Sequence, residues 1–305
     1  MSERMCIDIS MFAEKEIEES RASSSNGMFS TLRALLSSSK RGATGAALLC
    51  VICAIAVLAP FVAPYDPYAL GSSLLQPPSR DHLCGTDHLG RDVFSMLVYG
   101  TRVSLVVGVM AALISGLVGT LAGGIAGFFG GGTDRAISAI IDVFLMIPTF
   151  FLIIIIVAMF GSSLVNVMVI IGLTSWPSNA RLMRAEALSI RERGFIIGAR
   201  AIGESNWSIL FRHVIPNGIL PIVANTTMQV AGAILTEASL SFLGLGDPNV
   251  VSWGQLIQVG STYFTSGWWV STFGGLAVIL TVMSFYLLGD GINELLNSLE
   301  SGERR

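Results

Sequence analysis

The segment FIIGARAIGESNWSILFRHVIPN, residues 195–217, lies between long apolar stretches and differs from both of them. It carries two arginines, a histidine, a glutamate and a proline, so it is too polar to cross a bilayer. It is also too apolar to be a loop that contacts only solvent. Its role depends on how the flanking apolar stretches are arranged.

The composition of the chain indicates an integral membrane protein. Of the 305 residues, 52% are hydrophobic and only 13% are charged, whereas an ordinary soluble domain has about 25% charged residues. Six apolar stretches can form membrane-spanning helices, at 44–63, 103–129, 137–160, 163–177, 218–245 and 270–290. The sequence therefore predicts an all-α membrane protein with six transmembrane helices.

The positive charges predict its orientation. With six spans, fifteen of the eighteen Lys and Arg residues fall on one side, which places both termini in the cytoplasm. The fourth stretch is short, but without it the six arginines within 178–217 would lie outside. The predicted parts are an N-terminal tail at 1–43, in which residues 28–36 fit a short surface helix, a six-span domain at 44–296 with a cytoplasmic loop at 178–217, and a C-terminal tail at 297–305.

Small residues recur every fourth position in the second apolar stretch. They form two rows, Gly108, Ala112, Gly116 and Thr120, and Gly119, Gly123, Gly127 and Gly131. Small residues at this spacing let helix backbones approach closely inside a membrane. We interpret the rows as packing faces, either within the bundle or against a partner subunit.

The opening segment has the pattern of two short helices joined by a glycine. The first has an apolar face of Phe195, Ile196, Ala199 and Ile202, and the second has one of Trp207, Leu210, Phe211 and Val214. Gly203 is expected to end the first helix, Ser205 to cap the second and Pro216 to stop it before the fifth span. We call residues 195–217 the elbow. Its apolar face, rimmed by arginines, docks a partner, packs on its own bundle or lies in the headgroup region.

Polar residues in the fifth span are candidates for a translocation pathway. Asn225, Gln229, Thr236 and Glu237 are costly in a membrane unless they face other helices or water. Glu237 can meet the ammonium group of a peptide or another cation, or can form a structural hydrogen bond near the outer edge. Asp142 in the third stretch is expected to be structural.

The sequence gives no reason to expect catalysis, a bound cofactor or a metal. It lacks the glycine-rich phosphate loop of ATPases and any paired nucleophile and base. Cys50 and Cys53 lie within an apolar helix, which disfavours a zinc or redox pair. Asp81, His82, Cys84, Asp87, His88 and Asp92 cluster between the first two spans, where a turn with ion pairs involving Arg91 is the simpler interpretation than a metal site.

Four stretches together resemble the permeases of ABC importers. The elbow has IGARAIG at 197–203 and FRHVIPN at 211–217, and is similar to the family's E-A-A-x-x-x-G loop, although Ile197 and Gly198 replace the acid and the first alanine. The other three are CGTDHLGRDVFSMLVYGTRVSL at 84–105, LTEASLSFLGLG at 235–246 and LLGDGINELL at 287–296. The chain is most similar to the second permease subunit of the dipeptide, oligopeptide and nickel branch.

The resemblance implies the type I ABC-importer permease fold and an importer of di- or oligopeptides, with nickel or another small solute as an alternative. An ion-gradient-driven transporter using Glu237 and Asp142 is a further alternative. The implied partners are a homologous permease, two cytoplasmic ATPase subunits that use ATP, an extracytoplasmic solute-binding protein that His82 and His88 can touch, and membrane lipid, but no nucleic acid. The elbow residues implied to contact an ATPase are Gly198, Ala199, Arg200, Gly203, Trp207, Arg212, His213 and Pro216.

Overall fold

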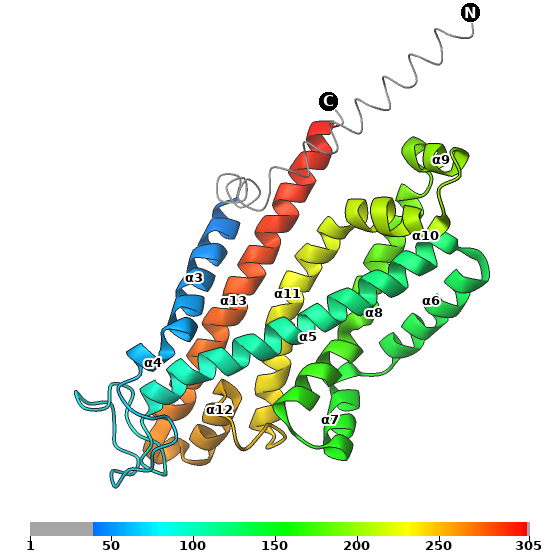
Figure 1. Cartoon of the computed structure of the whole chain (residues 1–305). Coiled ribbons are helices and arrows are strands. Elements are labelled where there is room, and N and C mark those ends of the chain that lie inside the picture. Colours follow the sequence, from blue (N-terminus) through cyan, green and yellow to red (C-terminus); the bar gives the residue numbers. More distant parts are fainter. Residues whose placement is uncertain (1–38, 304–305) are drawn as a thin grey trace, which may run out of the picture.

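The computed structural model describes residues 39–303 and the side chains up to residue 298, and every regular element in this range is helical (Figure 1). The long helices are α3 (Lys40–Val57), α5 (Val93–Phe129), α8 (Leu164–Ile190), α11 (Ile215–Phe242) and α13 (Phe264–Glu303). The shorter ones are α4 (Ala59–Val62), α6 (Gly131–Met146), α7 (Thr149–Phe160), α9 (Gly194–Ala201), α10 (Asn206–Ile209), the π-helical turn η1 (Leu210–Val214) and α12 (Trp253–Thr262). The surface helix predicted at 28–36 lies outside the described residues.

The helices agree with the predicted spans in four places and differ in two. Four are long and apolar enough to cross a membrane, namely Lys40–Val57, Val93–Phe129, Asn206–Phe242 and Phe264–Ser298. The third predicted span is bent by 86° between α6 and α7, so it is at most a broken crossing. Pro148 explains the break, because proline cannot donate a helical hydrogen bond and forces the preceding Ile147 into an extended conformation.

The fourth predicted span is part of α8, a continuous helix that also contains residues 178–190. By length and composition α8 is not among the four apolar helices, because its second half is polar. A count of six crossings is therefore not confirmed on these grounds. Helix α8 nevertheless packs within the bundle, because the most extensive contact of α5 is with α8.

The two rows of small residues in α5 pack within the bundle. A side chain on Gly119 or Gly123 would overlap Asn179 or the carbonyl of Ala180 in α8. The other row faces α11, where Gly108 lies against Ile234 and Gly116 against Thr226, whose hydroxyl would be 3.0 Å from an added Cβ. Gly131 is the exception, because α5 ends at Phe129 and Gly131 begins α6.

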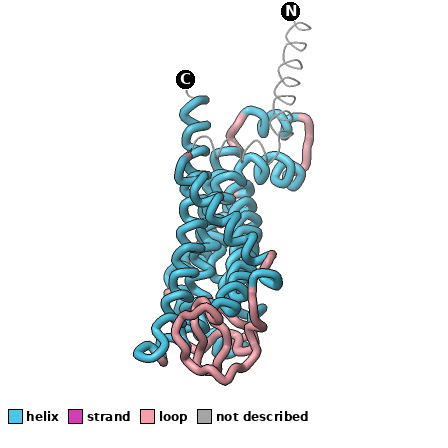
Figure 2. Tube along the Cα trace, turned by 90° about the vertical axis from the view of Figure 1, so that its left-hand side faces the viewer, coloured by secondary structure: helices cyan, strands magenta, loops and turns pink. Residues whose placement is uncertain are grey.

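The bundle has two distinct ends. The C-terminal end of α13, the start of α3 and the elbow lie at one end, and the loop of residues 63–92 lies with α12 at the other (Figures 1 and 2). At the first end the hydroxyl of Ser39 donates a hydrogen bond to Glu294, with an oxygen–oxygen distance of 2.6 Å. This contact holds the beginning of α3 against α13.

We expect the Gly123→Ala variant to be less stable than the wild type. The added methyl group would overlap the backbone of Ala180 and push α8 away from α5, which should cost about 1–3 kcal/mol. The measurement is the midpoint of heat-induced aggregation of the detergent-solubilised protein. Gly275→Ala in α13 is the matched control, because nothing lies within 4 Å of its added Cβ. Equal midpoints for the two variants would contradict this account of the α5–α8 contact.

Candidate functional site

The predicted elbow is present in the structure. Helix α9 ends before Gly203, which has a φ of +85°. Glycine adopts this left-handed conformation without strain and so lets the chain reverse. Ser205 then caps α10, its hydroxyl accepting a hydrogen bond from the backbone N–H of Ser208 at 3.3 Å. The glycine and the serine therefore do what their sequence positions predicted.

The prediction that Pro216 ends the second helix was wrong. The chain continues without interruption from α10 through η1 into α11, and Pro216 lies in the first turn of α11. In η1 the backbone N–H of Ile215 bonds the carbonyl of Leu210, five residues earlier. Such a π-helical turn makes room for a proline ring that would clash in a regular helix. The elbow is thus joined rigidly to the fifth predicted span.

One face of the elbow is packed on its own bundle. Ile196 of α9, Ile209 of α10 and Leu210 and Val214 of η1 are fully buried. They form one hydrophobic cluster with residues of α5 and α8, among them Phe128 and Met183. Burial of four large side chains here, each stabilising by about 1.5–3 kcal/mol, fixes the position of the elbow.

The opposite face is apolar and exposed. Ile202 at the turn is 84% exposed, and Trp207 and Phe211 are about half exposed. The two rings are stacked with centroids 6.1 Å apart, and Trp207 also lies 5.0 Å from the ring of Phe129. Packing on the bundle is therefore confirmed for Leu210 and Val214, while the aromatic row is uncovered and docking of a partner there stays a prediction.

Charged side chains surround the exposed face. The guanidinium of Arg200 lies over the ring of Phe128 at 5.3 Å, and Arg193 and Arg212 are exposed. Hydrogen bonds from Ser208 and from His213, at 2.6 and 3.1 Å, hold the pKa of the Glu204 carboxyl below its ordinary value. His213 is thus already engaged within the chain, so the arginines carry the uncompensated positive charge of this surface.

The predicted elbow glycines leave open space. Nothing lies within 4 Å of a Cβ placed on Gly198 or Gly203, and Ala199 between them is half-buried against the cluster below. A partner can therefore come close to the backbone at both positions.

The amide side chains predicted for the pathway take part in a hydrogen-bond network between three helices. The Nδ2 of Asn225 donates to Oδ1 of Asn179 in α8 at 2.8 Å, and Nδ2 of Asn179 donates to Oε1 of Gln229 at 2.9 Å. Ser115 of α5 also donates to Oε1 of Gln229, at 2.7 Å, and Nε2 of Gln229 donates to Ser178 at 2.6 Å. We did not predict from the sequence that Ser115 of α5 and Ser178 and Asn179 of α8 belong to this network. Their only indication in the sequence is that they are polar residues in helices that pack on other helices.

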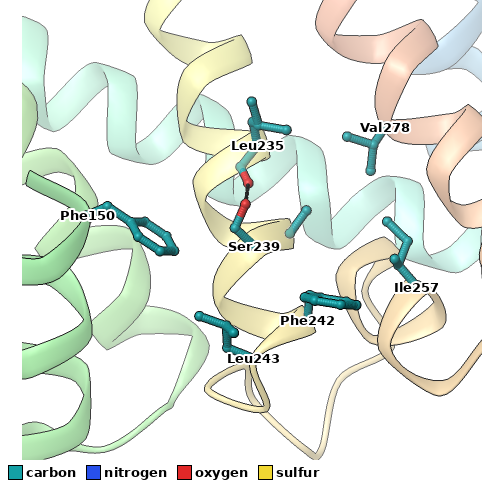
Figure 3. Close-up of a pocket in the computed structure, with 8 residues that line it drawn as sticks. Phe150, Leu235, Ser239, Phe242, Leu243, Ile257 and Val278 are labelled. Atoms are coloured by element: carbon teal, nitrogen blue, oxygen red, sulfur yellow. Dashed lines mark hydrogen bonds between the residues drawn. The ribbon is translucent and has the colours of Figure 1, made fainter. Parts of the chain in front are cut away.

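The other two pathway candidates lie apart from this network. The Thr236 hydroxyl bonds the carbonyl of Gly232, and Glu237 is 3% exposed with Oε1 accepting a hydrogen bond from Ser241 at 2.7 Å. The neighbouring pocket of about 460 Å³ is lined almost entirely by apolar side chains, and its hydroxyl, on Ser239, bonds the Leu235 carbonyl (Figure 3). The pocket therefore offers no charged side chain to a charged solute.

The loop of residues 63–92 forms the turn with ion pairs that the sequence suggested. The buried Asp87 accepts hydrogen bonds from two backbone N–H groups and binds the Arg91 guanidinium at 2.7 Å, and Asp92 caps α5 and bonds His82 at 2.9 Å. Burial and the nearby Asp92 raise the pKa of the Cys84 thiol to about 11. Among the residues that the structure describes, no three His, Cys, Asp or Glu side chains are grouped to hold a metal.

Comparison with known proteins connects this geometry with a family. Residues 119–299 match the model of the binding-protein-dependent transport system inner membrane component, and residues 32–78 match the N-terminal transmembrane domain of oligopeptide transport permease C. A glutathione transport system permease protein of Pectobacterium atrosepticum is 40% identical over 81% of this chain and 83% of its own length. A probable D,D-dipeptide transport system permease protein of Escherichia coli is 34% identical over 88% of this chain and 91% of its own length.

A solved structure supports the fold. A chain of the MetNI methionine ABC transporter in inward-facing conformations is 21% identical, with a TM-score of 0.52 over 64% of this chain and 93% of that one. The match covers most of the other chain, so the expected ABC-importer permease fold is confirmed. With family and fold in agreement, the protein is a multi-pass subunit of a larger transporter and not an enzyme. The chain belongs to the family of inner-membrane components of binding-protein-dependent transport systems.

Proposed function

We propose that this chain is one half of the translocation pathway of an ATP-driven peptide importer, and that its elbow couples the pathway to a cytoplasmic ATPase. The other half of the pathway is a homologous permease. Two ATPase subunits bind the ATP, and an extracytoplasmic solute-binding protein delivers the cargo. Closure of the ATPases opens the pathway outward, and hydrolysis returns it inward.

The observation that carries the coupling role is the two-faced elbow. Its inner face is buried on α5 and α8, while Ile202, Trp207 and Phe211 remain uncovered beside exposed arginines. An uncovered apolar patch rimmed by charge is typical of a protein-binding surface. Because α10, η1 and α11 form one continuous helix, a push on this surface moves the fifth predicted span directly.

The choice of peptides rests on the relatives. Three of them, at 34–40% identity, are named for glutathione, D,D-dipeptides and dipeptides, the last a permease of Alkalihalophilus pseudofirmus. All three cargoes are short peptides. The direct test is ATP-dependent uptake of radiolabelled dipeptides by proteoliposomes that contain the complete transporter and its solute-binding protein. Absence of uptake for dipeptides and glutathione alike would refute a peptide cargo.

We expect Gly203→Asp to uncouple ATP hydrolysis from uptake without preventing membrane insertion. The new carboxylate would lie in open space at the turn and oppose the positive charge that faces the partner. Uptake per ATP should fall about tenfold, which corresponds to about 1.4 kcal/mol of docking free energy.

Gly203→Asn is the matched control for this variant, because asparagine and aspartate tolerate a positive φ equally well and differ here in charge. The Asn variant should keep most of its coupling. Normal uptake by Gly203→Asp, or an equal loss in both variants, would contradict the electrostatic role of the elbow.

We also expect the elbow and the end of α8 that leads into it to lie in the cytoplasm, and the loop of residues 63–92 outside. In a chain whose four native cysteines are replaced, a membrane-impermeant maleimide added to intact spheroplasts should label Ser72→Cys and spare Ser189→Cys. Both positions are exposed in the structure, so accessibility alone does not distinguish them. The opposite labelling pattern would reverse the orientation that the positive charges predict.

A further inference from the structure

Two ion pairs connect α6 with α8, and they differ in exposure. Arg184 binds both carboxylate oxygens of Asp134, and these side chains are 36% and 18% exposed. Arg181 binds Asp142 through a single nitrogen–oxygen contact of 2.7 Å, and these side chains are 58% and 54% exposed. The first pair is shielded and held at two points, whereas the second is open to an incoming charged molecule.

The exposed pair lies next to the contact between α5 and α8. Arg181 follows Ala180, whose backbone is in contact with Gly123 of α5. At this level α5 is inside a stretch of residues, 103–129, that has no charged side chain. Charged groups beside an uncharged apolar helix segment normally face a water-filled cavity or other protein groups, because hydrocarbon does not solvate them. We therefore expect water or a further polar partner at the exposed sides of Arg181 and Asp142.

The break between α6 and α7 lies about one helical turn from the exposed pair. Asp142 and Met146 lie one turn apart on the same face of α6, and Met146, just before the break, is 80% exposed. Non-helical backbone at membrane depth is tolerated only where it is buried in protein or lines a water-filled cavity. In transporters, helices broken in this way commonly form the substrate site.

A polar strip leads from the ion pair toward α11. Ser178 is exposed and lies three residues before Arg181 on α8, so the two share a face. Its hydroxyl accepts a hydrogen bond from Gln229 at 2.6 Å, and Gln229 is held in turn by Asn179 and Ser115. The strip Asp142–Arg181–Ser178 thus has a rigid support on one side and an open surface on the other.

We propose that Arg181 and Asp142 form a binding site for the two charged ends of a zwitterionic peptide as it passes through the pathway; this inference rests on the proposed function. The planar Arg181 guanidinium suits the terminal carboxylate, which it can bind through two parallel hydrogen bonds. The Asp142 carboxylate binds the terminal ammonium. Ser178 offers its hydroxyl oxygen to a peptide N–H.

The resting ion pair explains why such a site releases its cargo. In the empty site Arg181 and Asp142 satisfy each other, and the peptide replaces one ion pair by two of the same chemical type. The net gain in free energy is small, because each new contact also removes the peptide end from water. A pathway needs binding of this kind, strong enough to admit the solute and weak enough to let it leave.

The test compares peptides with free and blocked ends in the complete transporter. Uptake is measured in proteoliposomes at peptide concentrations that saturate the solute-binding protein, for a free dipeptide, its C-terminal amide and its N-acetyl derivative. Each rate is divided by the wild-type rate for the same peptide, so that the preference of the binding protein cancels. Arg181→Gln should lower the uptake of the free dipeptide about tenfold, as for a loss of about 1.4 kcal/mol, and leave the amide within about twofold.

Asp142→Asn should show the complementary pattern, with loss for the free dipeptide and little change for the N-acetyl peptide. Arg184→Gln is the matched control, since it removes the shielded pair between the same helices and should affect all three peptides equally. Arg181→Lys retains the charge and should keep the preference for a free carboxylate even if Arg181→Gln fails to assemble.

The outcomes separate this inference from the function on which it rests. If the wild type imports peptides but the Arg181 variants affect free and amidated peptides equally, the pair is structural and the site is refuted. If the wild type imports none of the three peptides, the peptide cargo itself is refuted and the site with it. Selective loss for the peptide whose charge matches the mutated residue supports the site.

Discussion

The close approach of α5 and α8 is the contact on which the rest of the structure depends. Gly119, Gly123 and Gly127 leave no space for a side chain between the two backbones. In a membrane, lipid gives little hydrophobic drive for helices to associate, so such contacts and interhelical hydrogen bonds hold the bundle together. Here they draw the polar second half of α8 inward, which places Asn179 against Ser115 and Gln229.

The same contact between α5 and α8 forms the surface on which the elbow packs. Residues at the ends of α5 and α8, among them Phe128 and Met183, form the surface that receives Ile196, Ile209 and Leu210. The inner face of the elbow is thereby satisfied, and the outer face is left with aromatic rings and arginines. The elbow is thus held on the bundle by one face and leaves the other apolar face free. The proposed mechanical coupling needs this arrangement, because force applied to the free face is then not lost in local bending.

The polar groups within the bundle fall into two classes. Asn225, Gln229, Asn179 and Ser115 bond one another and act as interhelical contacts, whereas Asp142 and Arg181 are bonded but exposed. Only the burial of the side chains distinguishes the two classes, because in the sequence the members of both are polar residues in apolar surroundings. Glu237 is buried like the members of the first class, but its hydrogen bond to Ser241 lies within α11 and connects no second helix.

The sequence by itself determined the membrane class, most of the long helices, the elbow with its glycine and serine, and the family. The family follows from the resemblance of four stretches. The other features follow from local chemistry, because apolar length, the conformational freedom of Gly203 and the capping hydroxyl of Ser205 act within a few residues. It did not determine that Pro216 is absorbed by a π-helical turn, that the third apolar stretch is bent at Pro148, or which face of the elbow is covered. The π-helical turn and the bend are local responses to Pro216 and Pro148 that the apolar pattern does not reveal. The covered face of the elbow was decided only by the tertiary structure, because side chains of α5 and α8 pack against it.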